Sequence, residues 1–144
     1  MKIVLTPNPY RDKQFRTVQQ AKKILESCGV ETVMCLPFDV DRDYELPKTM
    51  DFRDLHREIK NADMLVCFGG DGTIQEVLSG VHDLSYITFG YIPTGSGNDF
   101  CRGMKLPTEP TEALNLILSD CRPHPMDVPI LTCSTGSSHF AISC

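Results

Sequence analysis

The 144-residue sequence lacks long apolar runs and clustered metal ligands, and both absences narrow its function. Its N-terminus has only a short apolar run before Thr6 and Pro7, too little for a signal peptide. No later run approaches the length of a membrane span. None of the seven cysteines forms a C-x-x-C pair, and the four histidines are isolated. We therefore expect a cytoplasmic protein with reduced thiols and no Cys/His metal cluster.

The sequence also lacks a basic cluster and a low-complexity segment. Lys and Arg are scattered and the net charge is −5, so we expect no nucleic-acid partner. The acidic run at residues 39–45 reads as a solvated loop. A chain of this length suits roughly one domain with a core of its own.

Strand-like and helix-like segments alternate from Lys2 to Asp120. Apolar runs predict strands, and apolar residues at helical spacing predict helices. The alternation predicts an α/β fold with a doubly wound, mostly parallel sheet. We expect strands at 2–6, 30–38, 63–70 and 86–93, and helices at 15–28, 51–62, 73–81 and 111–120.

The pattern changes after the two prolines of residues 121–125. Residues 126–144 read as strand, tight turn and strand, with "TGSS" at 135–138 as the turn. A lone hairpin is only marginally stable. We therefore predict a nucleotide-binding α/β domain at 1–124, and at 125–144 the start of a truncated, β-rich acceptor domain.

Two glycine loops follow two strands of the predicted sheet. "GGDGT" at 69–73 follows the third strand, and "TGSGND" at 94–99 follows the fourth. Both should lie at the carboxyl edge of the sheet, where ligands bind. Glycine lets backbone N–H groups approach an anion, and the hydroxyls of Thr73, Thr94 and Ser96 can bind phosphate oxygens. Either loop alone could be an ordinary turn or helix cap, so the pair is the more specific signal.

Neither loop carries the lysine of a Walker A motif, and neither matches G-x-G-x-x-G. The charge of a nucleoside triphosphate must then be neutralised by other means, and Mg²⁺ bound to carboxylates is the natural candidate. Asp71 lies in the middle of the first loop. It could reach the phosphates through Mg²⁺, or it could be a general base for an attacking hydroxyl. Both roles indicate phosphoryl transfer.

"GGDGT" resembles the signature shared by NAD kinases and diacylglycerol-type lipid kinases. Residues 70–80 and 91–107 resemble the catalytic domain of bacterial diacylglycerol kinases. Residues 1–38 instead resemble the opening of some bacterial NAD kinases. Lipid kinases more often follow the Asn-Pro of this region with Ser/Ala-Gly, whereas Tyr10 and Arg11 follow it here. The resemblance implies the N-terminal domain fold of this superfamily, which is similar to phosphofructokinase.

The resemblance implies an ATP-dependent kinase domain that transfers the γ-phosphoryl group to a lipid hydroxyl, with ATP and Mg²⁺ as cofactors. The alternatives are an NAD kinase and a non-catalytic nucleotide-binding module. In lipid kinases the carboxylate that activates the hydroxyl lies in the second domain, so we expect this chain alone to be inactive. The implied partners are a nucleotide and a lipid or small-molecule acceptor, with at most peripheral membrane contact. A homo-oligomer stays open.

The resemblance also assigns residues to the site. It places Asp71 at the reacting centre and at the magnesium, directly or indirectly. Glu76 matches an acidic position near the nucleotide, although a favourable charge near the start of a helix explains it almost as well. An ion pair at i, i+3 explains Asp99 and Arg102 without any function. The implied nucleotide-binding residues are Asn8, Gly69, Gly70, Gly72, Thr73, Glu76, Thr94, Gly95, Ser96, Gly97 and Asn98.

Overall fold

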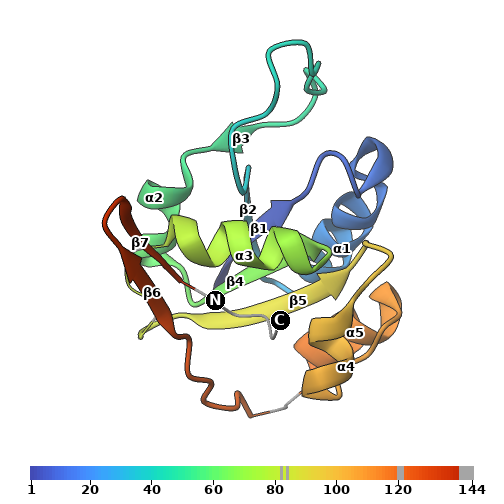
Figure 1. Cartoon of the computed structure of the whole chain (residues 1–144). Helices are drawn as coiled ribbons and strands as arrows, with labels where there is room; N and C mark the ends of the chain where they lie inside the picture. Colours follow the sequence, from blue (N-terminus) through green and yellow to red (C-terminus); the bar gives the residue numbers. More distant parts are fainter. Residues whose placement is uncertain (82, 84, 120–121, 140–144) are drawn as a thin grey trace.

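The computed structural model of the chain describes residues 1–81, 83, 85–119 and 122–139. A five-stranded sheet forms its centre, and helices cover both faces (Figure 1). The strands lie in the order β3-β2-β1-β4-β5, and every neighbouring pair is parallel. The strands are β1 (Lys2–Pro7), β2 (Glu31–Cys35), β3 (Phe52–Arg53), β4 (Met64–Gly69) and β5 (Thr88–Pro93).

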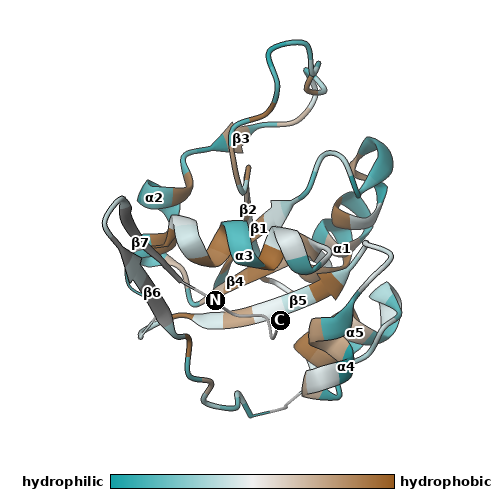
Figure 2. Ribbon diagram, in the orientation of Figure 1, coloured by the Kyte–Doolittle hydropathy of each residue, from teal (hydrophilic) through white to brown (hydrophobic). Residues whose placement is uncertain are grey.

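Two apolar cores lie on opposite faces of the sheet, because successive side chains of a strand point to opposite sides. Ile3 and Leu5 pack with the face covered by α1 and α5, whereas Val4 packs with the face covered by α2, α3 and α4. The strands therefore carry buried apolar side chains on both faces. In the hydropathy colouring of Figure 2, brown marks apolar residues along the strands and helices. The helices are η1 (Lys13–Phe15), α1 (Arg16–Ser27), α2 (Leu55–Glu58), η2 (Ile59–Asn61), α3 (Asp71–Gly80), α4 (Asp99–Met104) and α5 (Pro110–Leu118).

The strand order confirms the predicted doubly wound topology. From β1 the chain builds outward through β2 to β3, then crosses to the other side of β1 and builds through β4 to β5. The order reverses between β1 and β4, and ligands of open α/β sheets bind at such a switch point. The loops after β1 and β4 are therefore placed at the expected binding crevice. None of the described helices is long and apolar enough to cross a membrane.

Helix α1 ends where the sequence predicts, but its apolar face is narrower. Gly29 follows the helix with φ +79°, a left-handed conformation that glycine adopts without strain. Ile24 and Cys28 belong to the apolar residues at helical spacing that predict this helix, yet both are exposed. The core face of the helix consists of Val18, Ala21 and Leu25.

The predicted helix at 51–62 is wrong at its start. Phe52 lies in β3, opposite Met34 of β2, and its ring packs against that of Phe15 with centroids 5.3 Å apart. Burying this ring in the α1-side core fixes Phe52 in extended backbone. Helix α2 begins only after Asp54, whose carboxylate accepts a 2.9 Å hydrogen bond from the Arg57 N–H as an N-cap.

A hairpin of β6 (Ile130–Cys133) and β7 (Gly136–His139) forms a separate antiparallel sheet. This confirms the predicted change from βαβ units to a hairpin. The predicted turn at 135–138 is wrong, because Cys133 pairs with Gly136 and the connection is Ser134–Thr135. The proposed boundary after residue 124 stays a prediction. Residues 140–144, predicted as part of the second strand, lie outside the described residues.

Candidate active site at the switch point

The predicted site residues lie on three loops at the carboxyl ends of β1, β4 and β5. Asn8 follows β1, the segment Gly70–Thr73 continues β4 into α3, and Thr94–Asn98 joins β5 to α4. These strands are neighbours in the sheet, so their loops are brought to one edge.

Asn8 connects the loop after β1 to the start of helix α3. Its side-chain Nδ2 donates to Thr73 Oγ1 at 2.6 Å, and its backbone N–H donates to Phe68 O at 2.8 Å. Asn8 and Thr73 are both buried. The Thr73 hydroxyl therefore serves first as an internal acceptor that fixes the start of α3, rather than standing free for a ligand.

The two glycine loops touch backbone to backbone. The Gly69 carbonyl accepts hydrogen bonds from Thr94 N at 2.8 Å and Gly95 N at 3.0 Å. A Cβ on Gly95 would lie 2.7 Å from Gly70 Cα, and a Cβ on Gly69 would lie 2.3 Å from Thr73 Oγ1. Neither distance is tolerable for a side chain. Close approach of the two loop backbones therefore requires glycine at 95, whereas glycine at 69 makes room for the buried Thr73 side chain.

Asp71 opens helix α3, and its carboxylate caps helix α4. One carboxylate oxygen accepts from Asp99 N at 2.9 Å and the other from Phe100 N at 3.0 Å. Asn98, just before α4, has a left-handed backbone with φ 54°. The negative charge in the first glycine loop is thus stabilised by two amides and by the positive end of a helix. At the start of α3 itself, Thr73 N donates to Gly70 O at 3.0 Å, so the amides left for an outside partner are those of Asp71 and Gly72.

Tyr91 is a site residue that sequence reasoning missed. Its hydroxyl lies 2.9 Å from Gly69 O and 3.1 Å from Asn98 Oδ1, so one proton is shared between the two loops. Burial raises the pKa of this phenol above its ordinary value, which is already well above neutral pH, so the hydroxyl keeps its proton. Its one sequence signal is a hydroxyl in the buried half of the strand, three residues before the second glycine loop begins at Thr94.

The remaining predicted residues fall into inner and outer groups. Asn98 Nδ2 donates to Gly95 O at 2.9 Å, which closes the second loop on itself. Thr94 Oγ1 is buried and has no hydrogen-bond partner among the described residues, which leaves it available to an oxygen of a ligand. Ser96, Gly97 and Gly72 are exposed at the edge of the site.

Glu76 and the Asp99–Arg102 pair lie further out. The prediction placed Glu76 in the first helical turn. Helix α3 begins at Asp71, so Glu76 lies in its second turn instead. The helix-dipole explanation is correspondingly weaker. Partial burial raises the pKa of the Glu76 carboxyl. Arg102 Nη1 lies 2.6 Å from Asp99 Oδ1 in an exposed i, i+3 ion pair, as predicted.

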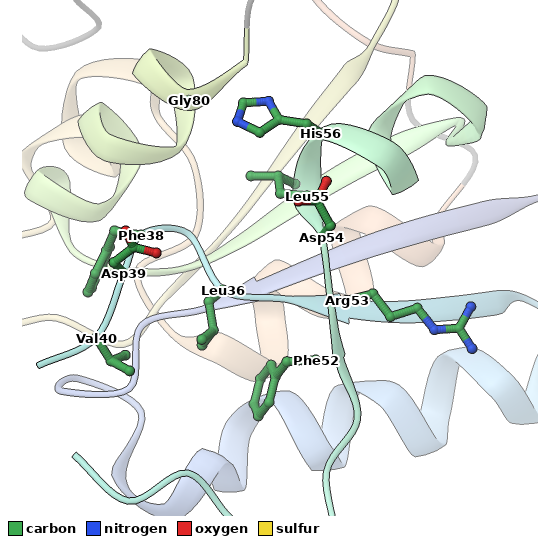
Figure 3. Close-up of a pocket in the computed structure, with 10 residues that line it drawn as sticks. All are labelled: Leu36, Phe38, Asp39, Val40, Phe52, Arg53, Asp54, Leu55, His56 and Gly80. Atoms are coloured by element: carbon green, nitrogen blue, oxygen red, sulfur yellow. The ribbon is translucent and has the colours of Figure 1, made fainter. Parts of the chain in front are cut away.

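A hollow of about 660 Å³ lies at the same edge, beyond the end of β2. Phe38, Asp39 and Val40 form one side of it, and the start of α2 and the last residue of α3 form the other (Figure 3). This hollow was not predicted from the sequence, because one of its sides comes from a segment without regular secondary structure. The residues around the hollow are Leu36, Phe38, Asp39, Val40, Phe52, Arg53, Asp54, Leu55, His56 and Gly80.

Comparison with known proteins identifies the family. The sequence profile of the diacylglycerol kinase catalytic domain matches residues 7–129. The chain belongs to this family. The match includes most of the N-terminal region that resembles NAD kinases, so it favours the lipid kinase prediction over the NAD kinase alternative.

Individual relatives agree with this assignment. A diacylglycerol kinase from Staphylococcus saprophyticus is 30% identical over 119 residues, which is 81% of this chain and 36% of the relative. A probable YegS-like lipid kinase from Chromohalobacter salexigens is 40% identical over 91 residues, which is 60% of this chain and 28% of the relative. The fold is similar to a Bacillus anthracis protein assigned as a diacylglycerol kinase, with TM-score 0.57, 23% identity, and coverage of 81% of this chain and 40% of the other. The chain thus spans about a third of the length of these curated relatives.

Proposed function

We propose that this chain is the ATP-binding part of a lipid kinase that transfers the γ-phosphoryl group of ATP to a hydroxyl of a diacylglycerol-type lipid. The observation that carries the proposal is the direct contact between the two glycine loops, in which the Asp71 carboxylate accepts hydrogen bonds from the start of α4. The family match supports the same activity. The chain acts from the cytoplasm and meets its lipid by peripheral contact with the membrane.

The loops bind the triphosphate mainly through backbone groups. The first amides of α3 supply donors and partial positive charge, and Thr94 Oγ1 supplies a hydroxyl at the inner side of the second loop. Phosphoryl transfer needs little covalent chemistry from the protein, so positioning and charge neutralisation carry most of the catalysis.

Magnesium fits this site as an ion that would bind together with the nucleotide phosphates, rather than as an ion held by protein ligands alone. The described residues contain no group of three or more His, Cys, Asp or Glu that could hold a metal by themselves. Mg²⁺ usually takes one or two carboxylates plus substrate phosphates and water. Asp71 is the carboxylate that would hold it, with lone pairs beyond the two that α4 engages. When bound, Mg²⁺ would neutralise the charge of the phosphates.

The test is a thermal-shift and product assay on the purified chain. With Mg²⁺, ATP at a hundred times its Kd should stabilise the fold by about 2.7 kcal/mol. Diacylglycerol, a sphingoid base and NAD are then offered as acceptors, alone and with the remainder of the full-length protein. Phosphorylated diacylglycerol in the complete protein supports the proposal, and NADP would replace it with the NAD kinase alternative. Absence of any ATP shift would refute nucleotide binding itself.

A further inference from the structure

The segment between β2 and β3 is held by an aromatic clasp, which we define as Tyr10, Phe38, Asp41 and Tyr44. The Tyr10 and Phe38 rings are stacked, with centroids 6.1 Å apart and planes at 2°. The Tyr10 and Tyr44 rings meet edge to face at 5.2 Å. Such pairs contribute beyond the area that they bury. One side chain from the loop after β1 thus contacts two rings of a segment about thirty residues away in sequence.

Hydrogen bonds close the clasp at both ends. The Tyr10 hydroxyl donates to Asp41 Oδ2 at 2.6 Å and accepts from Asp41 N at 3.1 Å. The Tyr44 hydroxyl donates to Pro9 O at 3.0 Å. The segment at 36–50 has no helix or strand of its own. Its position therefore depends on these side-chain contacts more than on backbone pairing.

The clasp joins the phosphate loops to the hollow. On one side, Tyr10 N donates to Asn8 Oδ1 at 2.9 Å, and Asn8 holds Thr73 at the start of α3. On the other side, Phe38 begins the wall of the hollow that continues through Val40 (Figure 3). The hollow touches Gly80 at the end of α3, roughly 14 Å along the helix from Asp71 at 1.5 Å rise per residue.

We propose that Tyr10 is a positioning residue for the nucleotide, which fixes the Phe38–Val40 wall against the turn that carries Asn8. This inference rests on the proposed function. It gives a role to Tyr10, a residue at which this chain departs from the Ser/Ala-Gly pattern of lipid kinases. A nucleotide whose phosphates lie on the α3 amides extends its nucleoside along the same edge toward the hollow. Tyr10 touches neither part and acts through Asn8 and Phe38.

The test compares ATP with inorganic tripolyphosphate, which engages the phosphate loops alone. In the full chain, Tyr10→Ala removes the contacts that hold the Phe38–Val40 wall in place. The population of chains competent to bind nucleotide falls, so the apparent Kd for ATP should rise about five-fold. Binding of tripolyphosphate changes less than two-fold by the same reasoning. Tyr10→Phe keeps the stack and loses only the hydroxyl, and it should retain most of the affinity. Tyr86→Ala, at an exposed tyrosine before β5, is the matched control and should change neither ligand.

Hydrogen exchange reports the clasp independently of any ligand. Tyr10→Ala should speed exchange within 36–44 while α3 and β4 keep the protection of the parent chain. Should Tyr10→Ala fail to fold, Tyr10→Phe, Asp41→Ala and their double variant carry the test. The double variant should weaken ATP binding no more than Tyr10→Phe alone, because Tyr10→Phe already removes the bond to Asp41 Oδ2 that Asp41→Ala removes, together with the bond from Asp41 N.

Two results would overturn the inference. One is faster exchange at 36–44 with ATP affinity unchanged. The other is an equal loss of affinity for ATP and for tripolyphosphate, which would show that the substitution acts on the phosphate loops. In both cases the parent chain still binds ATP, so the proposed function survives. A parent chain that binds no ATP contradicts the proposed function and this inference together.

Discussion

Replacing Gly95 with alanine should separate the two glycine loops. The new Cβ would meet Gly70 Cα at 2.7 Å and Gly70 N at 3.0 Å. Both are backbone atoms, so no rotation of a side chain can relieve the overlap. The φ of Gly95 is not in the left-handed region, so the effect is one of space and not of backbone conformation.

The expected cost follows from overpacking and from the bonds that would move. Inserting a methyl group into a tightly packed site costs about 1–3 kcal/mol. The two hydrogen bonds from Thr94 N and Gly95 N to Gly69 O would lengthen in the same movement. For a chain of this size, about 3–4 °C of melting temperature is lost per kcal/mol. We therefore expect Gly95→Ala to melt roughly 3–12 °C below the parent chain by the same scaling, with most of its ATP shift lost.

Gly103→Ala is the matched control for this variant. Gly103 lies inside the neighbouring helix α4, and a Cβ there meets nothing within 4 Å. Alanine in a helix interior gains about 0.5–1 kcal/mol over glycine. Gly103→Ala should therefore melt at or above the temperature of the parent chain and keep its ATP shift. A Gly95→Ala protein that melts with the parent chain and binds ATP equally would refute the role given to the contact between the loops.

Three further outcomes follow from the site and the core. Asp71→Asn places an amide NH₂ against one of the two N–H groups of α4, so it should destabilise the chain by about 1–3 kcal/mol in urea unfolding even without nucleotide. Tyr91→Phe leaves Gly69 O and Asn98 Oδ1 without their shared proton, at a cost of about 1 kcal/mol in the same assay. Burial raises the pKa of the Cys35 thiol to about 12, that of Cys101 to about 11, and that of Cys67 still further. Among the four cysteines whose side chains the structure describes, mass mapping after iodoacetamide at pH 8 should therefore find only the exposed Cys28 labelled.

The sequence predicted the sheet and its edge because the determining signals are local. Each central strand is an apolar run, and each glycine loop directly follows one, so topology alone brought Asn8, Gly70 and Gly95 together. Strand β3 was missed because two residues carry no periodicity. Its position comes from Phe52 packing on Phe15, far away in the sequence. The hairpin turn was shifted for a related reason, since the Cys133–Gly136 pairing is set by the register and not by glycine content.

The clasp and the capping role of Asp71 could not be predicted, because both depend on contacts between segments far apart in the sequence. In the sequence, Tyr10 stands after the Asn-Pro and departs from the lipid kinase pattern without an evident reason. Only the folded chain shows its partners Phe38 and Asp41. Similarly, Asp71 is twenty-eight residues from Asp99, and only the adjacency of β4 and β5 brings them together.

The capping geometry bears on the two roles that the sequence left open for Asp71. A general base must direct a free oxygen at the acceptor hydroxyl. Here each carboxylate oxygen accepts an amide N–H from the start of α4, which orients the group toward the second glycine loop. Accepting a proton as a base would neutralise the carboxylate and weaken the two charge-assisted hydrogen bonds from α4 that hold the loops together. Positioning the phosphates, or a metal bound to them, requires no such loss, because the remaining lone pairs stay available. The geometry is therefore easier to combine with a positioning role for Asp71 than with a role as base. Under the proposed lipid kinase function, activation of the hydroxyl would fall to a residue outside the two loops.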